Sequence, residues 1–300
     1  EAEDQVKRLH HHACLALWCG NNELESLAVG DSWAKPGMTW ENYEAFFDGV
    51  LGSVVARHAP GATYWPGSPH SPQGDRGQAD DPRSGDAHLW AVWHGKQPFE
   101  WYRTSEHRFA SEYGFQSFPE PRTVYGYTEE RDRNVTSYVM EHHQRSGIGN
   151  TTILQYMLEW YRLPDSFEHA LWASQILQGM AITYAAEHWR RSRPRSMGSI
   201  YWQLNDYWPV ASWSSIDYHG RWKALHYMAR RFYAPVLVSG VEDLERGTVD
   251  VHVCSDRMED TPATLTCSLT DLAGQVLHTE EHDVTVRANQ SAMLRTLALR

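Results

Sequence analysis

Two glutamates stand at positions that suit acid–base and nucleophilic chemistry on a sugar. Glu23 follows a short apolar run over residues 13–19 and two asparagines, and Glu112 lies at the end of a second segment, residues 108–113. Hydrolysis of a glycosidic bond needs one carboxyl group to protonate the leaving oxygen and another to attack or assist at the anomeric carbon. The two glutamates are far apart along the chain, so only folding can bring them to one substrate.

Asn22 precedes Glu23 directly and suits the same chemistry. Its amide can bond a sugar 2-hydroxyl, a contact that strengthens in the transition state. Taken alone, an Asn-Asn-Glu sequence is also typical of a loop that caps a helix.

The elements that must position these side chains alternate between short apolar segments and segments of helical periodicity. Several of the short segments run into polar residues at their carboxyl ends, as the strands of a (β/α)8 barrel do around an active site. The expected strands cover residues 13–19, 62–65, 89–93, 108–113 and 198–204. The expected helices cover residues 40–59, 166–191 (with Ser166 as N-cap) and 223–232, and residues 5–12 are expected to be the end of another helix. A long loop is expected over residues 66–87. We therefore predict an α/β fold with a partial catalytic barrel over residues 1–234.

The pattern changes after residue 234. Val249, Val251 and Val253 alternate with polar residues, and segments 263–269 and 281–286 follow. Period-two alternation of this kind is typical of antiparallel strands with one buried face. We predict a small Ig-like β-sandwich over residues 235–300, which we expect to be incomplete at its end.

Composition limits the classes of partner and of site. The 300-residue chain carries a formal net charge of −11 without any long run of like charges, which disfavours nucleic acid. Its 14 Trp and 15 Tyr can stack on sugar rings, although a large aromatic core explains them equally well. Its four cysteines lack metal-ligand spacing, and HExxH, GxSxG and GxGxxG patterns are absent. We expect no metal, no organic cofactor and no membrane partner.

The same sequence contains no apolar run of membrane-spanning length, and its first residues do not resemble a targeting segment. We therefore expect a soluble chain, either cytoplasmic or secreted. Its oligomeric state is left open.

Five motifs in order make the chain resemble the β-mannosidases of glycoside hydrolase family 2. Each motif combines aromatic residues with groups that can bond sugar hydroxyls. They lie at residues 18–23 (WCGNNE), 64–70 (YWPGSPH), 85–95 (GDAHLWAVWHG), 111–119 (SEYGFQSFP) and 202–209 (WQLNDYWP). The resemblance covers nearly the whole chain and is weaker after residue 235.

This resemblance implies that residues 1–234 form about strands four to eight of the barrel. It implies Glu23 as general acid/base at the end of strand four and Glu112 as nucleophile at the end of strand seven, with anomeric configuration retained. The substrate would be a terminal non-reducing β-D-mannose residue of an oligosaccharide, released through a covalent glycosyl-enzyme. Asn22 would hold the 2-hydroxyl, and Trp202 would form part of the wall around the sugar.

Other aromatic residues are weaker candidates for the same pocket. Trp33 and Tyr102 are placed there by approximate spacing only. His88, Trp90 and Trp93 lie on the segment between the two glutamates, where they either line the site or fill the barrel. Further acids, at Glu25, Asp86, Glu106 and Asp206, lie near the motifs and can be mistaken for catalytic groups.

Alternatives remain at this stage. Another family 2 activity, such as β-galactosidase or β-glucuronidase, differs in the sugar hydroxyls that it selects. A non-catalytic carbohydrate-binding fragment is the second alternative, because the family has a jelly-roll domain, a sandwich domain and three barrel strands ahead of this point. We expect residues 1–300 alone to have little activity and to aggregate through exposed strand edges.

Overall fold

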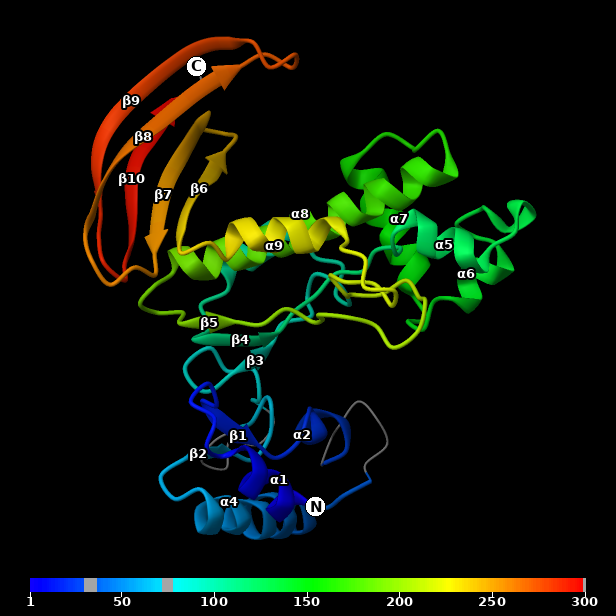
Figure 1. Cartoon of the computed structure of the whole chain (residues 1–300), viewed down its shortest axis with the longest axis vertical. Coiled ribbons are helices and arrows are strands. Elements are labelled where there is room, and N and C mark those ends of the chain that lie inside the picture. Colours follow the sequence, from blue (N-terminus) through cyan, green and yellow to red (C-terminus); the bar gives the residue numbers. More distant parts are fainter. Residues whose placement is uncertain (30–36, 72–77, 299–300) are drawn as a thin grey trace. The chain divides into compact units, whose positions relative to one another are not determined.

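The computed structural model describes residues 1–29, 37–71 and 78–298 (Figure 1). The chain divides into two compact units, each built from several stretches. The first unit comprises residues 1–95, 105–113 and 198–201, and the second comprises residues 96–104, 114–197 and 202–300. Each unit is described by itself.

The described residues of the first unit form five short strands, all in parallel pairs. Strand β1 (Leu17–Cys19) pairs with β2 (Thr63–Trp65), and β3 (Ala87–His88), β4 (Phe109–Glu112) and β5 (Gly198–Ser199) form a three-stranded sheet in that order. Gly198 is required in β5, because a Cβ there would lie 2.2 Å from the ring of Phe109. Parallel strands have their carboxyl ends at one edge, so the loops that follow β3 and β4 emerge together.

Helices in the first unit connect and support β1 and β2. They are α1 (Ala2–Leu9), α2 (Leu24–Leu27), α3 (Trp40–Tyr43), the π-helical segment η1 (Glu44–Leu51) and α4 (Gly52–His58). The helix expected at residues 40–59 is thus confirmed, with Thr39 accepting a hydrogen bond from the backbone N–H of Asn42 at its start. Its apolar residues divide between two small cores, one around Tyr43 and Phe47 and one around Val55.

Four of the five expected strands overlap strands of the structure, but the third was wrong. The strands expected at residues 13–19 and 198–204 are shorter than predicted and cover only Leu17–Cys19 and Gly198–Ser199. The strand expected at residues 89–93 is instead Ala87–His88, and residues 91–95 form turns. Val92 and Trp93 are fully buried within those turns. A short apolar run fits a buried turn as well as a buried strand, because periodicity alone does not separate them.

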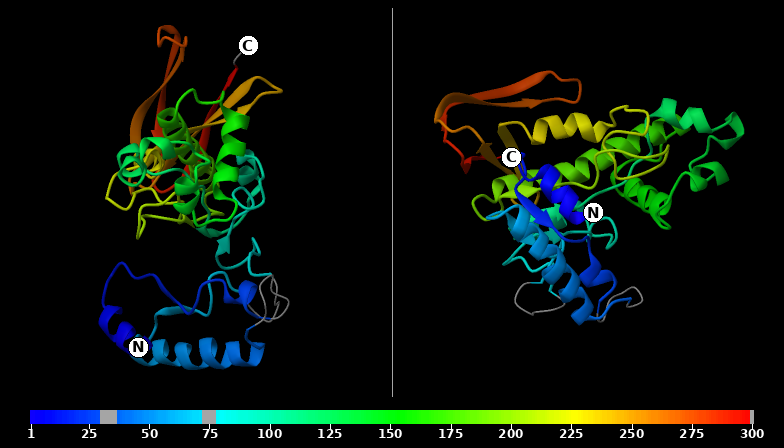
Figure 2. Two further views of the ribbon diagram at one scale, coloured as in Figure 1. Left: turned by 90° about the vertical axis from the view of Figure 1, so that its right-hand side faces the viewer. Right: turned by 60° about the horizontal axis from the view of Figure 1, so that its bottom comes forward.

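The second unit begins with helices. They are the 3-10 segment η3 (Phe99–Thr104), α5 (Pro121–Tyr127), the 3-10 turn η4 (Glu130–Asp132), α6 (Tyr138–His142), α7 (Gly149–Trp160), α8 (Phe167–Arg191) and α9 (Ala224–Phe232). Helix α8 confirms its prediction, and the hydroxyl of Ser166 accepts a hydrogen bond from the backbone N–H of His169. Helices α8 and α9 run side by side (Figure 2). They approach closely at Gly179, where a Cβ would lie 2.2 Å from Sδ of Met228.

Antiparallel strands complete the second unit. They are β6 (Val236–Asp243), β7 (Thr248–Ser255), β8 (Thr261–Thr270), β9 (Val276–Val286) and β10 (Ser291–Ala298). Among the described residues they form one sheet in the order β10-β7-β6 and a separate β8-β9 pair, in keeping with the expected period-two pattern.

The strands begin at Val236, next to the expected domain boundary, yet they are tied to the helices before them. Buried Arg190 of α8 donates to the carbonyls of Phe232 and Ala234, each at 2.7 Å, and pairs with Asp256 at 3.0 Å. Within the described parts of the chain, no helix has both the length and the apolar character needed to cross a membrane.

Candidate active site

The loop that ends β1 holds Glu23 in an unusual backbone conformation. Its φ is +58° and its ψ is 10°, the left-handed region that residues other than glycine seldom occupy. Hydrogen bonds fix it there, because Glu23 donates its N–H to the carbonyl of Ser68 at 2.9 Å and Ser68 donates its own N–H to Asn21 at 2.9 Å. Strain of this kind costs about 1 to 3 kcal/mol and is concentrated at functional sites.

A buried carboxylate, Glu25, anchors the same loop. It accepts hydrogen bonds from the hydroxyl of Tyr43 at 2.8 Å and from the backbone N–H of Ser71 at 3.0 Å, and it contacts Nδ1 of His70. Burial raises the pKa of Glu25, but these hydrogen bonds outweigh it and the net effect is a lowered pKa. Glu25 is therefore an ionised structural anchor for the segment that carries Glu23.

Glu112 ends β4, beside the first residues after β3. Its carbonyl accepts the N–H of Leu89 at 2.7 Å, and its Oε2 accepts a hydrogen bond from the indole of Trp90 at 3.3 Å. The pKa of Glu112 is raised, chiefly by burial and also by the charge of Glu23. The charge of His88 and the hydrogen bond from Trp90 oppose that rise.

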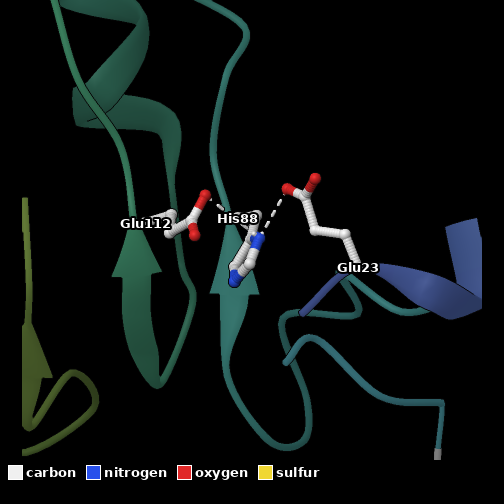
Figure 3. Close-up of side chains that lie close together, drawn as sticks. All are labelled: Glu23, His88 and Glu112. Atoms are coloured by element: carbon white, nitrogen blue, oxygen red, sulfur yellow. Dashed lines mark hydrogen bonds and ion pairs between the residues drawn. The ribbon is translucent and has the colours of Figure 1, made fainter. Parts of the chain in front are cut away.

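His88, the last residue of β3, lies between the two glutamates (Figure 3). Its Nδ1 is 2.7 Å from Oε1 of Glu23 and 3.3 Å from Oε2 of Glu112. Burial would lower the pKa of His88, but the hydrogen bond to Glu23 and the charges of both glutamates outweigh it, so the pKa is raised. The imidazole of His88, with its raised pKa, lies between two carboxylates at the electrostatic centre of the site.

The three groups are close enough for concerted chemistry. Ligating atoms of Glu23, His88 and Glu112 all lie within 4.8 Å of one another. That spacing fits the retaining arrangement of carboxyl groups, roughly 5 to 5.5 Å, rather than the inverting one of roughly 6.5 to 9.5 Å. One nitrogen and two oxygens also resemble a zinc donor set, but an imidazole must be deprotonated to coordinate, and the raised pKa opposes that. We assign no metal ligand here.

Further polar groups support His88 from behind. Its Nε2 is 2.9 Å from the hydroxyl of Ser68, which donates to Asp86 at 2.5 Å, and Ser111 donates to the same oxygen of Asp86 at 2.6 Å. Asp80 accepts the backbone N–H of His88 at 2.7 Å. The sequence did not assign roles to these residues, although Ser68 and Asp86 both lie within quoted motifs.

The remaining candidates have different surroundings. Asn22 is exposed next to Glu23, and Trp90 contacts Glu112, so both lie at this site. Trp93 is fully buried, which places it in the core of the first unit. Trp202, 43 % exposed, belongs to the second unit, and Trp33 lies outside the described residues.

Tyr102 does not fit its expected role. Its side chain is fully buried within the second unit, with its ring edge-on to that of Trp189 at 5.8 Å. A ring without exposed surface cannot stack on a sugar, so we correct Tyr102 to a core residue. Approximate spacing alone could not distinguish a pocket wall from a core position.

Comparison with known proteins gives a consistent result. Residues 247–300 match the family model of the mannosidase Ig/CBM-like domain. The chain is 32 % identical to the β-mannosidase of Capra hircus over 291 residues, covering 89 % of the chain and 32 % of that protein. It is 34 % identical to β-mannosidase B of Thermothelomyces thermophilus over 259 residues, covering 79 % of the chain and 30 % of that protein.

Solved structures agree. The crystal structure of a β-D-mannosidase from Dictyoglomus thermophilum superposes with a TM-score of 0.89 at 31 % identity, over 99 % of this chain and 36 % of that one. An exo-chitosanase of Amycolatopsis orientalis shares the fold, with a TM-score of 0.72 at 14 % identity over 97 % of this chain and 34 % of that one. The chain thus spans about a third of the length of the proteins it matches. In sequence and in fold it is related to the β-mannosidases, which confirms the resemblance that its motifs indicated.

Proposed function

We propose that the protein is a retaining exo-β-glycosidase that releases terminal non-reducing β-D-mannose from oligosaccharides. The observation that carries the proposal is the convergence of Glu23 and Glu112 on His88, with their nearest ligating atoms within 4.8 Å. The relatives named β-mannosidase support the substrate. Because this chain spans about a third of each of them, the activity of the whole protein is part of the proposal.

The two carboxyl groups differ in solvent access, which supports their separate roles. The side chain of Glu23 is 25 % exposed and that of Glu112 is 12 % exposed. A general acid/base must exchange protons with the leaving group and with water, so the more exposed Glu23 suits that role. The better buried Glu112, fixed by the indole of Trp90, suits attack on carbon.

The reaction then follows a double displacement. Glu112 attacks the anomeric carbon while Glu23 protonates the departing glycosidic oxygen, which leaves mannose bound covalently to Glu112. Glu23, now ionised, removes a proton from a water molecule that attacks the same carbon, and Glu112 departs. Two inversions give net retention.

The remaining expectations belong to the same proposal. Asn22 holds the 2-hydroxyl from its exposed position beside Glu23, and Trp90 contributes an aromatic wall. The part of Trp202 in that wall is a prediction from its motif alone. Strands β1 to β5 correspond to about strands four to eight of a (β/α)8 barrel, and residues 235–300 form an Ig-like sandwich domain. The parallel pairing of β1–β2 and of β3–β4–β5 supports the barrel assignment.

Hydrolysis by the complete gene product that carries this chain tests the proposal. We expect nitrophenyl β-mannoside to be cleaved with a kcat/KM at least tenfold above those of the β-galactoside and the β-glucuronide. A hydrogen bond to one sugar hydroxyl contributes up to about 1.5 kcal/mol, and the loss of that much binding energy in the wrong sugar is roughly tenfold. Preference for the β-galactoside or the β-glucuronide would establish the alternative enzyme. Binding of manno-oligosaccharides without cleavage of any glycoside would establish a non-catalytic carbohydrate-binding protein.

A further inference from the structure

The hydroxyl of Ser68 links His88 to a carboxylate that touches neither glutamate of the pair. Nε2 of His88 lies 2.9 Å from Oγ of Ser68, and Oγ of Ser68 lies 2.5 Å from Oδ2 of Asp86. The hydroxyl of Ser111 reaches the same Oδ2 at 2.6 Å. The side chain of His88 is only 3 % exposed, so water has little access to these contacts.

The number of hydrogens on each group determines which atom donates in each of these hydrogen bonds. An ionised carboxylate only accepts hydrogen bonds, and a hydroxyl has one hydrogen to donate. Asp86 therefore receives the hydrogens of both Ser68 and Ser111. Because the hydrogen of Ser68 is committed to Asp86, its oxygen can only accept from His88, and Nε2 must carry a proton.

We propose that Asp86, acting through Ser68, keeps a proton on Nε2 of His88, so that Nδ1 shares one further proton with Glu23. This inference rests on the proposed function of Glu23 as general acid/base. Asp86, Ser68 and His88 are positioning residues, because none of them touches the reacting carbon.

The shared proton has two positions across the 2.7 Å contact between Nδ1 of His88 and Oε1 of Glu23. On Nδ1 it gives an imidazolium beside a carboxylate. On Oε1 it gives a neutral imidazole, protonated at Nε2, that accepts a hydrogen bond from a carboxylic acid. When the proton moves from Nδ1 to Oε1, Glu23 becomes a carboxylic acid that can protonate the leaving oxygen. In the second step Glu23 takes a proton from the attacking water, and this proton is again shared between Oε1 and Nδ1.

Charged groups face His88 from each neighbouring segment. Glu23 and Glu112 lie at Nδ1, Asp80 accepts the backbone N–H, and Asp86 acts through Ser68 at Nε2. All four are acids, and together they favour retention of the second proton on the ring, in line with the raised pKa of His88. The pair therefore stays protonated to higher pH than an isolated histidine and carboxylate would.

Loss of the Ser68 hydroxyl has a specific consequence. Without its acceptor at Nε2, neutral His88 can place its only proton on Nδ1, where it donates to Glu23 and holds that carboxylate ionised. The proton shared by Nδ1 of His88 and Oε1 of Glu23 is then lost from the pair at lower pH.

The first test is the pH profile of kcat/KM for nitrophenyl β-mannoside, measured on the complete gene product. In Ser68→Ala we expect the basic limb to move down by about one pH unit, equivalent to a tenfold change in the proton equilibrium. Ser68→Thr, which keeps the hydroxyl, should restore the limb. Ser105→Ala is the matched control, because it removes a buried hydroxyl that contacts another imidazole, Nδ1 of His107 at 2.8 Å.

The proposal is overturned if the basic limb of the kcat/KM profile does not move in Ser68→Ala, or if it moves equally far in Ser105→Ala. A second test needs neither turnover nor a variant that folds well. Nitrogen-15 NMR of labelled histidines should show neutral His88 protonated at Nε2 in the unaltered protein, and Nδ1 protonation overturns the inference. Because this measurement does not depend on hydrolysis, failure of the proposed function and failure of the proton assignment are told apart.

Discussion

Replacing His88 by glutamine removes the charge between the two carboxylates while keeping an N–H donor of similar reach. A full charge on Nδ1, 3.3 Å from Oε2 of Glu112, stabilises the ionised carboxylate by about 5 kcal/mol at an effective dielectric constant of about 20. Relaxation of side chains and water reduces this upper bound. We expect the pKa of Glu112, already raised by burial, to rise by a further 1 to 3 units, roughly 1.4 to 4 kcal/mol.

The sign of the effect follows from the proposed role of Glu112 as nucleophile. The nucleophile must be ionised in the free enzyme, so a higher pKa moves the acidic limb of kcat/KM to higher pH. The assay is the hydrolysis of nitrophenyl β-mannoside by His88→Gln over a wide pH range. His169→Gln is the control, because His169 forms an exposed ion pair with Asp165 and should leave the limb in place. An acidic limb that stays fixed or moves to lower pH in His88→Gln would refute the reasoning.

Three further predictions concern stability, each measured by urea denaturation. Lys223 is fully buried, and burial lowers its pKa to about 7, so above that pH the unfolded chain binds more protons than the folded one. From pH 7 to pH 9.5 the unfolding free energy should therefore rise by up to a few kcal/mol more in the unaltered protein than in Lys223→Met. Equal slopes of unfolding free energy against pH would contradict this. In Gly20→Ala the new Cβ would lie 2.5 Å from a backbone oxygen, so we expect a loss of about 1 to 3 kcal/mol. Gly126→Ala, with no atom within 4 Å, should lose nothing, and similar losses in both would be inconsistent with the packing. Glu25→Gln should lose about 1 to 3 kcal/mol at pH 7. Because the pKa of Glu25 lies below its ordinary value of 4.5 in the folded state, its stabilising effect is complete above that pH and is lost as the pH falls below it. The loss in Glu25→Gln should therefore shrink below about pH 4.5, and a constant loss would argue against an ionised anchor.

Much of the fold followed from local sequence signals. Helix α8 was predictable because Ser166 caps a long stretch in which apolar residues recur at helical spacing. Helices α5, α6 and α7 were missed, although Glu120 and Ser137 accept capping hydrogen bonds at the starts of α5 and α6. Those helices are short, with 7, 5 and 12 residues, so few apolar repeats mark them. Strands β6 and β10 were also missed.

The candidate site was only partly predictable for a related reason. Glu23 and Glu112 could be named because each follows a short apolar segment and lies in a motif that resembles the β-mannosidases. The strands that precede them, β1 and β4, belong to separate parallel sheets, so strand pairing alone does not predict that the two side chains meet. The part played by His88 could not be fixed, because the strand was placed two residues late and its side-chain direction depends on that register. The contacts of Ser68 and Asp86 come from loops, whose paths the sequence does not determine.

The central claim is that Glu112 is the nucleophile that attacks the sugar and Glu23 is the general acid/base. Incubation of the complete gene product with a 2-deoxy-2-fluoro-β-mannosyl fluoride, followed by proteolysis and mass spectrometry, tests it directly, because the fluorine slows the second displacement and traps the covalent intermediate. We predict one fluorosugar on the peptide that contains Glu112, attached to that carboxylate. Attachment to Glu23, or turnover of β-mannosides with inverted configuration and no trapped sugar, would contradict the account.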